Sequence, residues 1–106
     1  MPRFTRREAE ALLPEVRPLL EDLKRRKSAY DRRASAPVAR EIEALVGEIG
    51  ALGVEVKDLD RGLIDFRTLR DGEEVYLCWR LGEGDRIGWW HTIEGGFAAR
   101  RPLVEN

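Results

Sequence analysis

The sequence has very few residues of the types that build disulfide frameworks or metal clusters. It contains one cysteine, one histidine and one methionine among 106 residues. A single cysteine excludes an internal disulfide framework and a multi-cysteine zinc or iron–sulfur site within one chain. No apolar run approaches the roughly 18 residues of a membrane span, and no signal-peptide core follows Met1. We therefore expect no membrane span and a cytoplasmic location.

An excess of charge of one sign is also lacking. Lysine and arginine together number 19, and aspartate and glutamate together number 20. Because nucleic-acid binders usually show a basic excess, this balance argues against nucleic acid as a partner. One basic cluster is present at residues 24–27, with Arg32 and Arg33, and it could attract phosphate or an anionic membrane surface. It falls in the C-terminal half of a predicted helix, where cations complement the helix dipole.

The pattern of apolar residues changes at Gly53. Residues 1–53 show helical spacing, and residues 54–106 show short strands separated by turns. A chain of this length predicts one domain over residues 1–106. We expect an α+β fold in which an N-terminal antiparallel helical hairpin packs on a small antiparallel β-sheet, a β-meander followed by a C-terminal tail.

The first helix is predicted to begin at Thr5, where Thr5-Arg6-Arg7-Glu8 reads as a capping box. Pro14 and Pro18 lie within it, and each removes a backbone donor. We therefore expect a short helix that ends near Leu13, followed by a kink or restart. The restarted helix is expected to end between residues 33 and 35.

A second helix is predicted from a start signal at Ser35 to a stop at Gly53. Only a few residues join the two helices, so they should pair antiparallel. The apolar stripe of the first helix is wider than one partner helix covers. This stripe includes Leu12, Leu13, Leu19 and Leu20. We therefore expect a homodimer whose interface includes the first helix.

The last two predicted strands, Val75–Leu81 and Ile87–Ile93, form a hairpin with a loop at residues 82–85. A symmetric hairpin places Cys78 opposite Trp89 and pairs residue 76 with residue 91. One face is apolar and is expected to meet the helices, with Val75, Leu77, Trp79, Leu81 and Trp90. The other face mixes aromatic, cationic and titratable side chains, namely Tyr76, Cys78, Arg80, Ile87, Trp89 and His91. Such a mixture is a poor solvent-facing surface, so we expect the tail, a partner or a ligand to cover it.

The candidate ligand-binding residues come from this mixed face and from the tail. They are Tyr76, Cys78, Arg80, Trp89, His91 and Arg101. Phe97 is expected to pack near one of the two tryptophans of the last strand. Arg101 is expected to anchor the tail by pairing with a carboxylate such as Asp65. His91 is expected to stay partly accessible.

Cys78 and His91 could form a thiol–imidazole pair for nucleophilic catalysis. With a carboxylate such as Glu83, Asp65 or Glu94 they could instead supply three metal ligands. No nucleophile elbow or oxyanion-loop pattern surrounds the cysteine, and no His-x-x-x-His or Cys-x-x-Cys pair is present. We therefore assign no catalytic residue, no metal and no cofactor. We favour a non-catalytic binding or assembly module with a protein or small-molecule partner. The alternative is a small enzyme or ligand binder that uses the mixed face.

Short segments along most of the chain carry a family signature. They are Phe4-Thr5, Glu8-Ala9, Leu12-Leu13-Pro14, Gly62-Leu63-Ile64-Asp65-Phe66, Cys78-Trp79-Arg80, Trp90-His91, Gly96-Phe97 and Arg101-Pro102. Together they resemble a bacterial family catalogued as a domain of unknown function, number 2203. The combination of Cys-Trp-Arg with Trp-His is fairly specific. The resemblance implies a small soluble bacterial protein, and it brings no activity and no catalytic residue with it.

Overall fold

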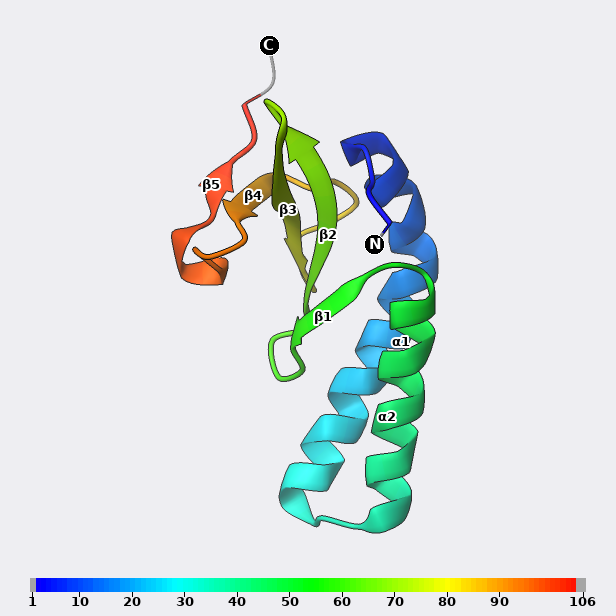
Figure 1. Cartoon of the computed structure of the whole chain (residues 1–106). Coiled ribbons are helices and arrows are strands. Elements are labelled where there is room, and N and C mark those ends of the chain that lie inside the picture. The colour runs from blue at the N-terminus through cyan, green and yellow to red at the C-terminus, as the bar shows by residue number, and fades with distance from the viewer. Residues whose placement is uncertain (1, 105–106) are drawn as a thin grey trace.

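A computed structural model describes residues 2–104 and shows two α-helices, a short 3-10 helix and a five-stranded antiparallel sheet (Figure 1). This arrangement confirms the predicted α+β class. The helices are α1 (Arg6–Arg32), α2 (Ala36–Ala51) and a short 3-10 helix, η1 (Phe97–Ala99). The strands are β1 (Glu55–Asp58), β2 (Leu63–Arg70), β3 (Glu73–Arg80), β4 (Trp89–Thr92) and β5 (Arg101–Pro102). They lie side by side in chain order as a meander. Within residues 2–104, neither long helix has the run of apolar residues that crossing a membrane requires.

Helix α1 begins at the predicted capping box and then continues through both prolines. The Thr5 hydroxyl accepts from the Glu8 amide at 3.1 Å, and the Glu8 carboxylate accepts from the Thr5 amide at 2.8 Å. The helix is unbroken at Pro14 and Pro18, so the predicted end near Leu13 is wrong. Both prolines are exposed, where water can bind the carbonyls left without a partner. The buried stripe of the same helix holds it in place, and it comprises Ala9, Leu13, Val16, Leu20 and Leu23. Packing of this stripe outweighs the two missing hydrogen bonds.

Helix α2 begins where the sequence predicts. The Ser35 hydroxyl accepts from the Val38 amide at 3.3 Å, and the helix ends at the cap Leu52. Gly53 follows with a φ of +87°, a left-handed conformation that favours glycine. The two helices form the predicted antiparallel hairpin, and its far half extends past the sheet (Figure 1).

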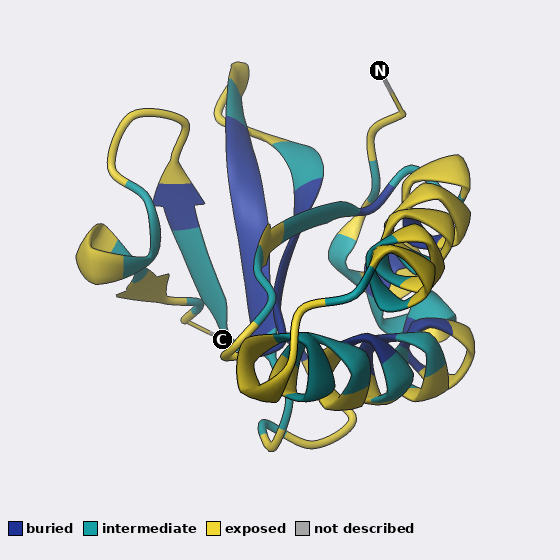
Figure 2. Ribbon diagram, turned by 90° about the horizontal axis from the view of Figure 1, so that it is seen from below, coloured by how far each residue is buried: buried dark blue, intermediate teal, exposed yellow. Residues whose placement is uncertain are grey.

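The inner face of the sheet packs against the helices. Phe66 on β2 and Trp79 on β3 are both fully covered in one hydrophobic cluster with the buried stripe of α1. In Figure 2 the buried central strands lie between the helices on one side and the C-terminal segment on the other. The sheet therefore has an outer face, away from the helices, and the C-terminal segment lies on that side.

Ile87 joins the inner core, so its predicted place on the mixed face is wrong. Strand β4 starts only at Trp89, and the connection before it turns back to α1. Arg6 Nε donates to the Ile87 carbonyl at 2.7 Å, and the Ile87 amide donates to the Glu10 carboxylate at 2.8 Å. These two hydrogen bonds direct the Ile87 side chain into the core. The sequence could not reveal them because their partners lie far away along the chain.

The predicted strand register is confirmed where β3 and β4 pair. Cys78 is opposite Trp89, and Tyr76 is opposite His91. Strand β2 pairs with the other edge of β3 and places Asp65 opposite Cys78. Side chains alternate between the two faces along each strand, so this register gathers a set of polar side chains on the outer face.

Candidate functional site

The outer face of the sheet holds a buried cluster of three titratable side chains. Asp65, Cys78 and His91 come from β2, β3 and β4, and their exposed fractions are 1%, 0% and 2%. One potential ligand atom from each residue lies within 4.8 Å of those of the other two. The expectation that His91 stays partly accessible is therefore wrong. The imidazole lies against the Asp65 carboxyl, the Thr92 carbonyl and the Tyr76 ring, whose centre is 5.3 Å away, and these contacts account for its burial.

The contact between His91 and Asp65 requires one proton that the two side chains share. The Nδ1 atom of His91 lies 2.8 Å from the carbonyl oxygen of Thr92, which can only accept, so Nδ1 carries a proton. The Nε2 atom lies 3.0 Å from Asp65 Oδ2. A neutral imidazole protonated at Nδ1 and an ionised carboxylate would place two acceptors in contact. The pair is consequently an imidazolium with a carboxylate, or a neutral imidazole with a carboxylic acid. Burial raises the pKa of Asp65, and the charge on His91 opposes that rise.

The second carboxyl oxygen of Asp65 is an unusual atom. Oδ1 is buried and has no hydrogen-bond partner of ordinary geometry among residues 2–104. The neighbouring Cys78 thiol interacts with the Asp65 carboxyl only as a weak donor. Leaving a buried acceptor unsatisfied costs about 1–3 kcal/mol. In native proteins such an atom calls for an explanation, such as a bound water or ion. It therefore marks a position where something outside the chain can bind.

The Cys78 thiol is held in its neutral form. Burial, with an added contribution from the neighbouring Asp65 charge, raises the pKa of Cys78 to about 12. The Arg100 guanidinium acts in the opposite direction, and its Nη1 lies 3.9 Å from Sγ. The thiolate is the nucleophilic form of cysteine, so a thiol with this pKa is a poor nucleophile near neutral pH.

The C-terminal segment covers the cluster through Arg100. Its guanidinium forms two hydrogen bonds to the Glu83 carboxylate, at 2.6 and 3.2 Å. The same group lies 4.3 Å from the ring centre of Trp89 and 4.5 Å from that of Phe97. One guanidinium therefore ties the tail to the β3–β4 connection and contacts both aromatic rings.

The expectation that Arg101 anchors the tail by pairing with Asp65 is wrong. Asp65 pairs with His91, and Arg101 lies over the ring of Trp90 at 5.6 Å from its centre. The adjacent Arg100 makes the anchoring contacts instead. Neighbouring residues of an extended segment point to opposite sides, and the sequence alone did not show which of the two arginines faces the cluster.

A second network borders the cluster on the side of β1. The Tyr76 hydroxyl donates to Glu55 at 2.8 Å, and Arg67 and Lys57 pair with the same carboxylate at 3.0 and 3.1 Å. Burial alone would raise the pKa of Glu55, but these donors outweigh it and the pKa is lowered. The Tyr76 pKa is raised by burial and by the Glu55 charge. Lys57 and Arg67 also lie over the Tyr76 ring, at 4.6 and 5.2 Å from its centre.

A pocket of about 240 Å³ lies beside the cluster. Asp65 and His91 are among its lining residues, together with Tyr76, Lys57 and Phe97. Arg61 and Arg80 lie over the Phe97 ring, at 5.6 and 5.8 Å from its centre. The pocket therefore combines a polar, titratable lining with aromatic and cationic groups.

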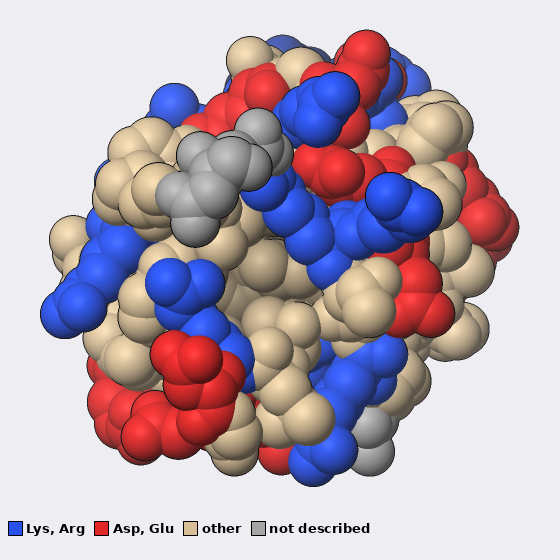
Figure 3. All heavy atoms as spheres, turned by 90° about the horizontal axis from the view of Figure 1, so that it is seen from above, with Lys and Arg blue, Asp and Glu red and all other residues tan. Residues whose placement is uncertain are grey.

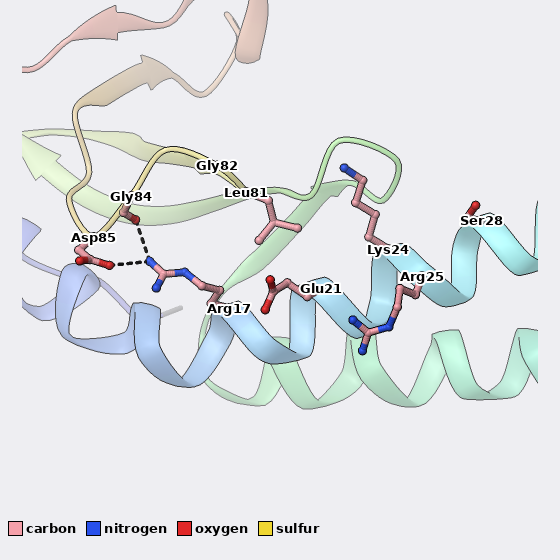
Figure 4. A pocket seen from close by; sticks show the side chains of 9 residues that line it. All are labelled: Arg17, Glu21, Lys24, Arg25, Ser28, Leu81, Gly82, Gly84 and Asp85. Carbon is pink, nitrogen blue, oxygen red and sulfur yellow. Dashed lines mark hydrogen bonds and ion pairs between the residues drawn. The ribbon is translucent and has the colours of Figure 1, made fainter.

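A larger hollow lies elsewhere, between α1 and the β3–β4 connection, with a volume of about 770 Å³ (Figure 4). In this groove Arg17 donates to the Gly84 carbonyl at 2.8 Å and pairs with Asp85 at 3.0 Å. The groove is open and contains no buried titratable cluster among its lining residues. Chemistry rather than size therefore identifies the smaller pocket as the candidate site.

Acidic side chains neutralise much of the predicted basic cluster on α1. Arg26 pairs with Asp22 and Glu41, and Lys27 pairs with Asp31 and Asp60. On the face of the molecule seen in Figure 3, basic and acidic side chains are intermingled. Neither the paired cluster on α1 nor this face forms the extended basic surface that binding of a nucleic-acid backbone requires.

The predicted candidates occupy three different places. Tyr76, Cys78 and His91 meet at the cluster; Arg80 and Trp89 lie at its cover, beside Phe97 and Arg100; Arg101 lies apart, over Trp90. Sequence reasoning missed Glu55 and Arg100, and it treated Asp65 only as a possible carboxylate partner. A usable signal for Asp65 was present, since it interrupts the apolar run of residues 63–66. No comparable signal marked Arg100.

A family model described as "Uncharacterized conserved protein (DUF2203)" matches residues 29–103. This range includes all of the sheet and every residue of the buried cluster. No curated protein and no solved structure matches the chain.

Proposed function

The chain belongs to the DUF2203 family of uncharacterised conserved proteins, and we propose that it is a small non-catalytic binding module. Its binding site is the pocket on the outer face of the sheet, beside Asp65 and His91. The observation that carries this proposal is the buried, unpartnered Oδ1 atom of Asp65 at a pocket-lining residue. A ligand that contacts this atom would remove the cost of leaving it unsatisfied.

The size of the pocket favours a small ligand over a macromolecule. A volume of about 240 Å³ is below the roughly 300–1,000 Å³ of drug-sized sites, so an ion or a small molecule fits best. The tail covers part of the site through Arg100, which restricts access from solvent. Both features support a buried, compact ligand.

The state of the cluster supports a non-catalytic role. The Cys78 pKa of about 12 keeps the thiol protonated, and both ring nitrogens of His91 already have partners. A general base needs a free lone pair within reach of its substrate, and His91 has none in this arrangement. The alternative of a small enzyme would require the Asp65–His91 pair to separate. The proposal also places the protein in the cytoplasm, where a reduced Cys78 would persist.

Native mass spectrometry of the intact chain tests this proposal. We expect a small adduct under non-denaturing conditions that denaturation removes. The variant Asp65→Asn should lose the adduct, and Glu94→Gln, which changes an exposed carboxylate of the β4–β5 loop, should keep it. If the native chain, purified without chelators, shows only the mass of the protein without an adduct, the proposal is wrong.

A second proposal concerns assembly as a homodimer through the helices. In the stripe from which the sequence predicts a dimer, Leu13 and Leu20 are buried in the chain's own core, and Leu12 and Leu19 are half-buried against it. The far half of the hairpin is different, because residues 24–48 include no buried residue. Ile42 and Leu45 pack only in part against the core, Tyr30 is half-buried, and Val46 is 37% exposed. This surface supports dimerisation through the far half of the hairpin.

Light scattering tests the assembly proposal. A dimer has twice the 12.2 kDa mass of the chain. The variant Val46→Glu should shift the mass toward that of the monomer. The control Leu69→Glu, which changes an exposed leucine on β2 beside the start of α1 and not in the far half of the hairpin, should leave the mass unchanged. A monomeric mass for the native chain at tens of micromolar would contradict dimerisation.

A further inference from the structure

We infer that Asp65, Cys78 and His91 form a binding site for one divalent transition-metal ion, with Zn²⁺ as the expected example. The inference rests on the proposed function, because it names the ligand of the same site. No short-spaced ligand motif exists in the sequence, and for that reason a metal was not expected from it. Three adjacent strands of the meander bring the ligands together instead.

The three residues supply a ligand set that suits zinc. Imidazole nitrogen, thiolate sulfur and carboxylate oxygen are its usual ligands in proteins. One such atom from each residue lies within 4.8 Å of the others, so small side-chain movements bring all three to a common ion. The unpartnered Oδ1 of Asp65 is independent support, because a metal ion is a partner that this buried oxygen lacks within the chain.

The surroundings of the ligands match those of a metal site. The hydrogen bond from His91 Nδ1 to the Thr92 carbonyl fixes the ring orientation and leaves Nε2 as the ligand atom. Arg100 lies next to Cys78 Sγ and is held there by Glu83. Its positive charge can therefore stabilise a thiolate at Cys78. Outer contacts of this kind are what orient and tune metal ligands.

The charges balance with and without the ion. Without metal, the Asp65–His91 pair shares one proton and Cys78 keeps its own, so the cluster is neutral. Binding of M²⁺ releases both protons to solvent and leaves one carboxylate, one thiolate and one neutral imidazole around the ion. The loaded cluster is again neutral, which avoids the cost of a net charge in a buried place.

The ligand types also indicate which ions are rejected. Magnesium and calcium prefer oxygen ligands, and one carboxylate is too few for either. Thiolate and imidazole select softer ions such as zinc, cobalt and nickel. Three protein ligands leave a fourth tetrahedral position, and the pocket lined by Asp65 and His91 lies beside it.

Titration with Co²⁺ under reducing conditions tests the inference. A thiolate bound to cobalt gives a charge-transfer absorption band, and the chain has only one cysteine, so such a band can arise only from Cys78. We expect saturation at one ion per chain and displacement of cobalt by zinc. Zinc should also raise the melting temperature of the metal-free protein.

Two variants separate metal binding from folding. Asp65→Asn keeps a partner for His91 Nε2, because the amide N–H can donate to it, but it removes the carboxylate ligand. Its cobalt affinity should fall at least about 100-fold, since losing an outer partner alone costs 10- to 100-fold. The control Glu94→Gln should bind cobalt as the native chain does.

The outcomes distinguish this inference from the proposed function. If adding cobalt to the metal-free native chain gives no thiolate band, and adding zinc does not raise its melting temperature, the metal inference is wrong. If native mass spectrometry then shows an organic adduct, the pocket still binds a small ligand and the proposed function stands. If it shows no adduct of any kind, both fail. If Asp65→Asn retains the full cobalt–thiolate band, Asp65 is not needed as a ligand, and the proposed ligand set is also wrong.

Discussion

Asp65 and His91 are joined across the full width of strand β3. Asp65 belongs to β2 and His91 to β4, yet Oδ2 and Nε2 lie 3.0 Å apart. On β3, Cys78 lies opposite Asp65 and Tyr76 lies opposite His91, so the contact runs diagonally across this strand. The pair therefore binds three strands together at their outer face.

The first prediction concerns the stability that this pair provides. Replacing His91 by alanine leaves the buried carboxyl of Asp65 without its partner. Breaking a buried pair in this way costs about 3–5 kcal/mol of unfolding free energy. Chemical denaturation measures the loss, with Glu94→Ala as an exposed control expected to change by less than about 0.5 kcal/mol. A loss below about 1 kcal/mol for His91→Ala would show that the buried pair contributes little.

The second prediction compares two changes at Asp65. Asparagine supplies an N–H donor to His91 Nε2 and needs no shared proton, whereas alanine supplies nothing. Asp65→Asn should therefore destabilise the metal-free protein by at least about 1 kcal/mol less than Asp65→Ala. Denaturation midpoints of both variants, measured in the presence of a chelator, check this order. The reverse order would contradict the assignment of one shared proton to the Asp65–His91 pair.

The third prediction concerns the acid side of the stability profile. The donors around Glu55, first Tyr76 and then Lys57 and Arg67, outweigh its burial and hold its pKa below the ordinary value, so the unfolded chain takes up its proton first as the pH falls. The stability contributed by Glu55 is therefore complete above the ordinary glutamate pKa of about 4.3 and is lost as the pH falls through the lower folded value.

A direct comparison with Glu55→Gln measures this contribution. The variant should be about 1–3 kcal/mol less stable at pH 7, because hydrogen bonds to a charged acceptor are replaced by weaker ones. The difference should shrink as the pH falls below about 4. Denaturation curves at several pH values provide the test. A difference that grows toward acid pH would contradict the assigned direction of the shift.

The fourth prediction concerns the cover over Cys78. Arg100→Ala removes the contacts of the tail with Glu83 and Trp89, so the cover should open more often. If opening becomes easier by about 1.4 kcal/mol, alkylation of Cys78 should accelerate about tenfold. The neighbouring Arg101→Ala, which changes an exposed residue of β5, is the matched control and should leave the rate unchanged. Equal acceleration in both variants would show that Arg100 does not hold the cover.

The fifth prediction concerns the prolines of α1. Pro14→Ala restores a donor for the carbonyl of Glu10 in an unbroken, exposed part of the helix. The gain in hydrogen bonding is partly offset by the greater freedom of the unfolded chain, and a net stabilisation of about 1–2 kcal/mol is expected. Calorimetry measures the change in melting temperature. A lower melting temperature would indicate that Pro14 has a packing role.

Local signals in the sequence predicted much of the fold. The capping box at Thr5, the start at Ser35 and the register that pairs Cys78 with Trp89 are all properties of short stretches of chain. The continuation of α1 through both prolines was not predictable in this way, because it depends on packing against residues that are distant in the sequence. Long-range contacts to α1 likewise place Ile87 in the core.

The candidate site was predictable only in part. Alternation along one hairpin gathered Tyr76, Cys78 and His91, which the structure confirms as neighbours on one face. The contribution of Asp65 depends on how β2 aligns with β3, and the role of Arg100 depends on the path of the tail. Both are tertiary relationships that residue spacing does not encode.

X-ray diffraction from crystals grown with Zn²⁺, with data collected on both sides of the zinc absorption edge, would locate the ion itself. We expect one strong anomalous peak per chain among Asp65, Cys78 and His91, within about 2.0–2.3 Å of one ligand atom from each. We also expect the hydrogen bond between Asp65 and His91 to be replaced by bonds to the ion. Absence of a peak there, with Asp65 and His91 still hydrogen-bonded to each other, would contradict the metal inference.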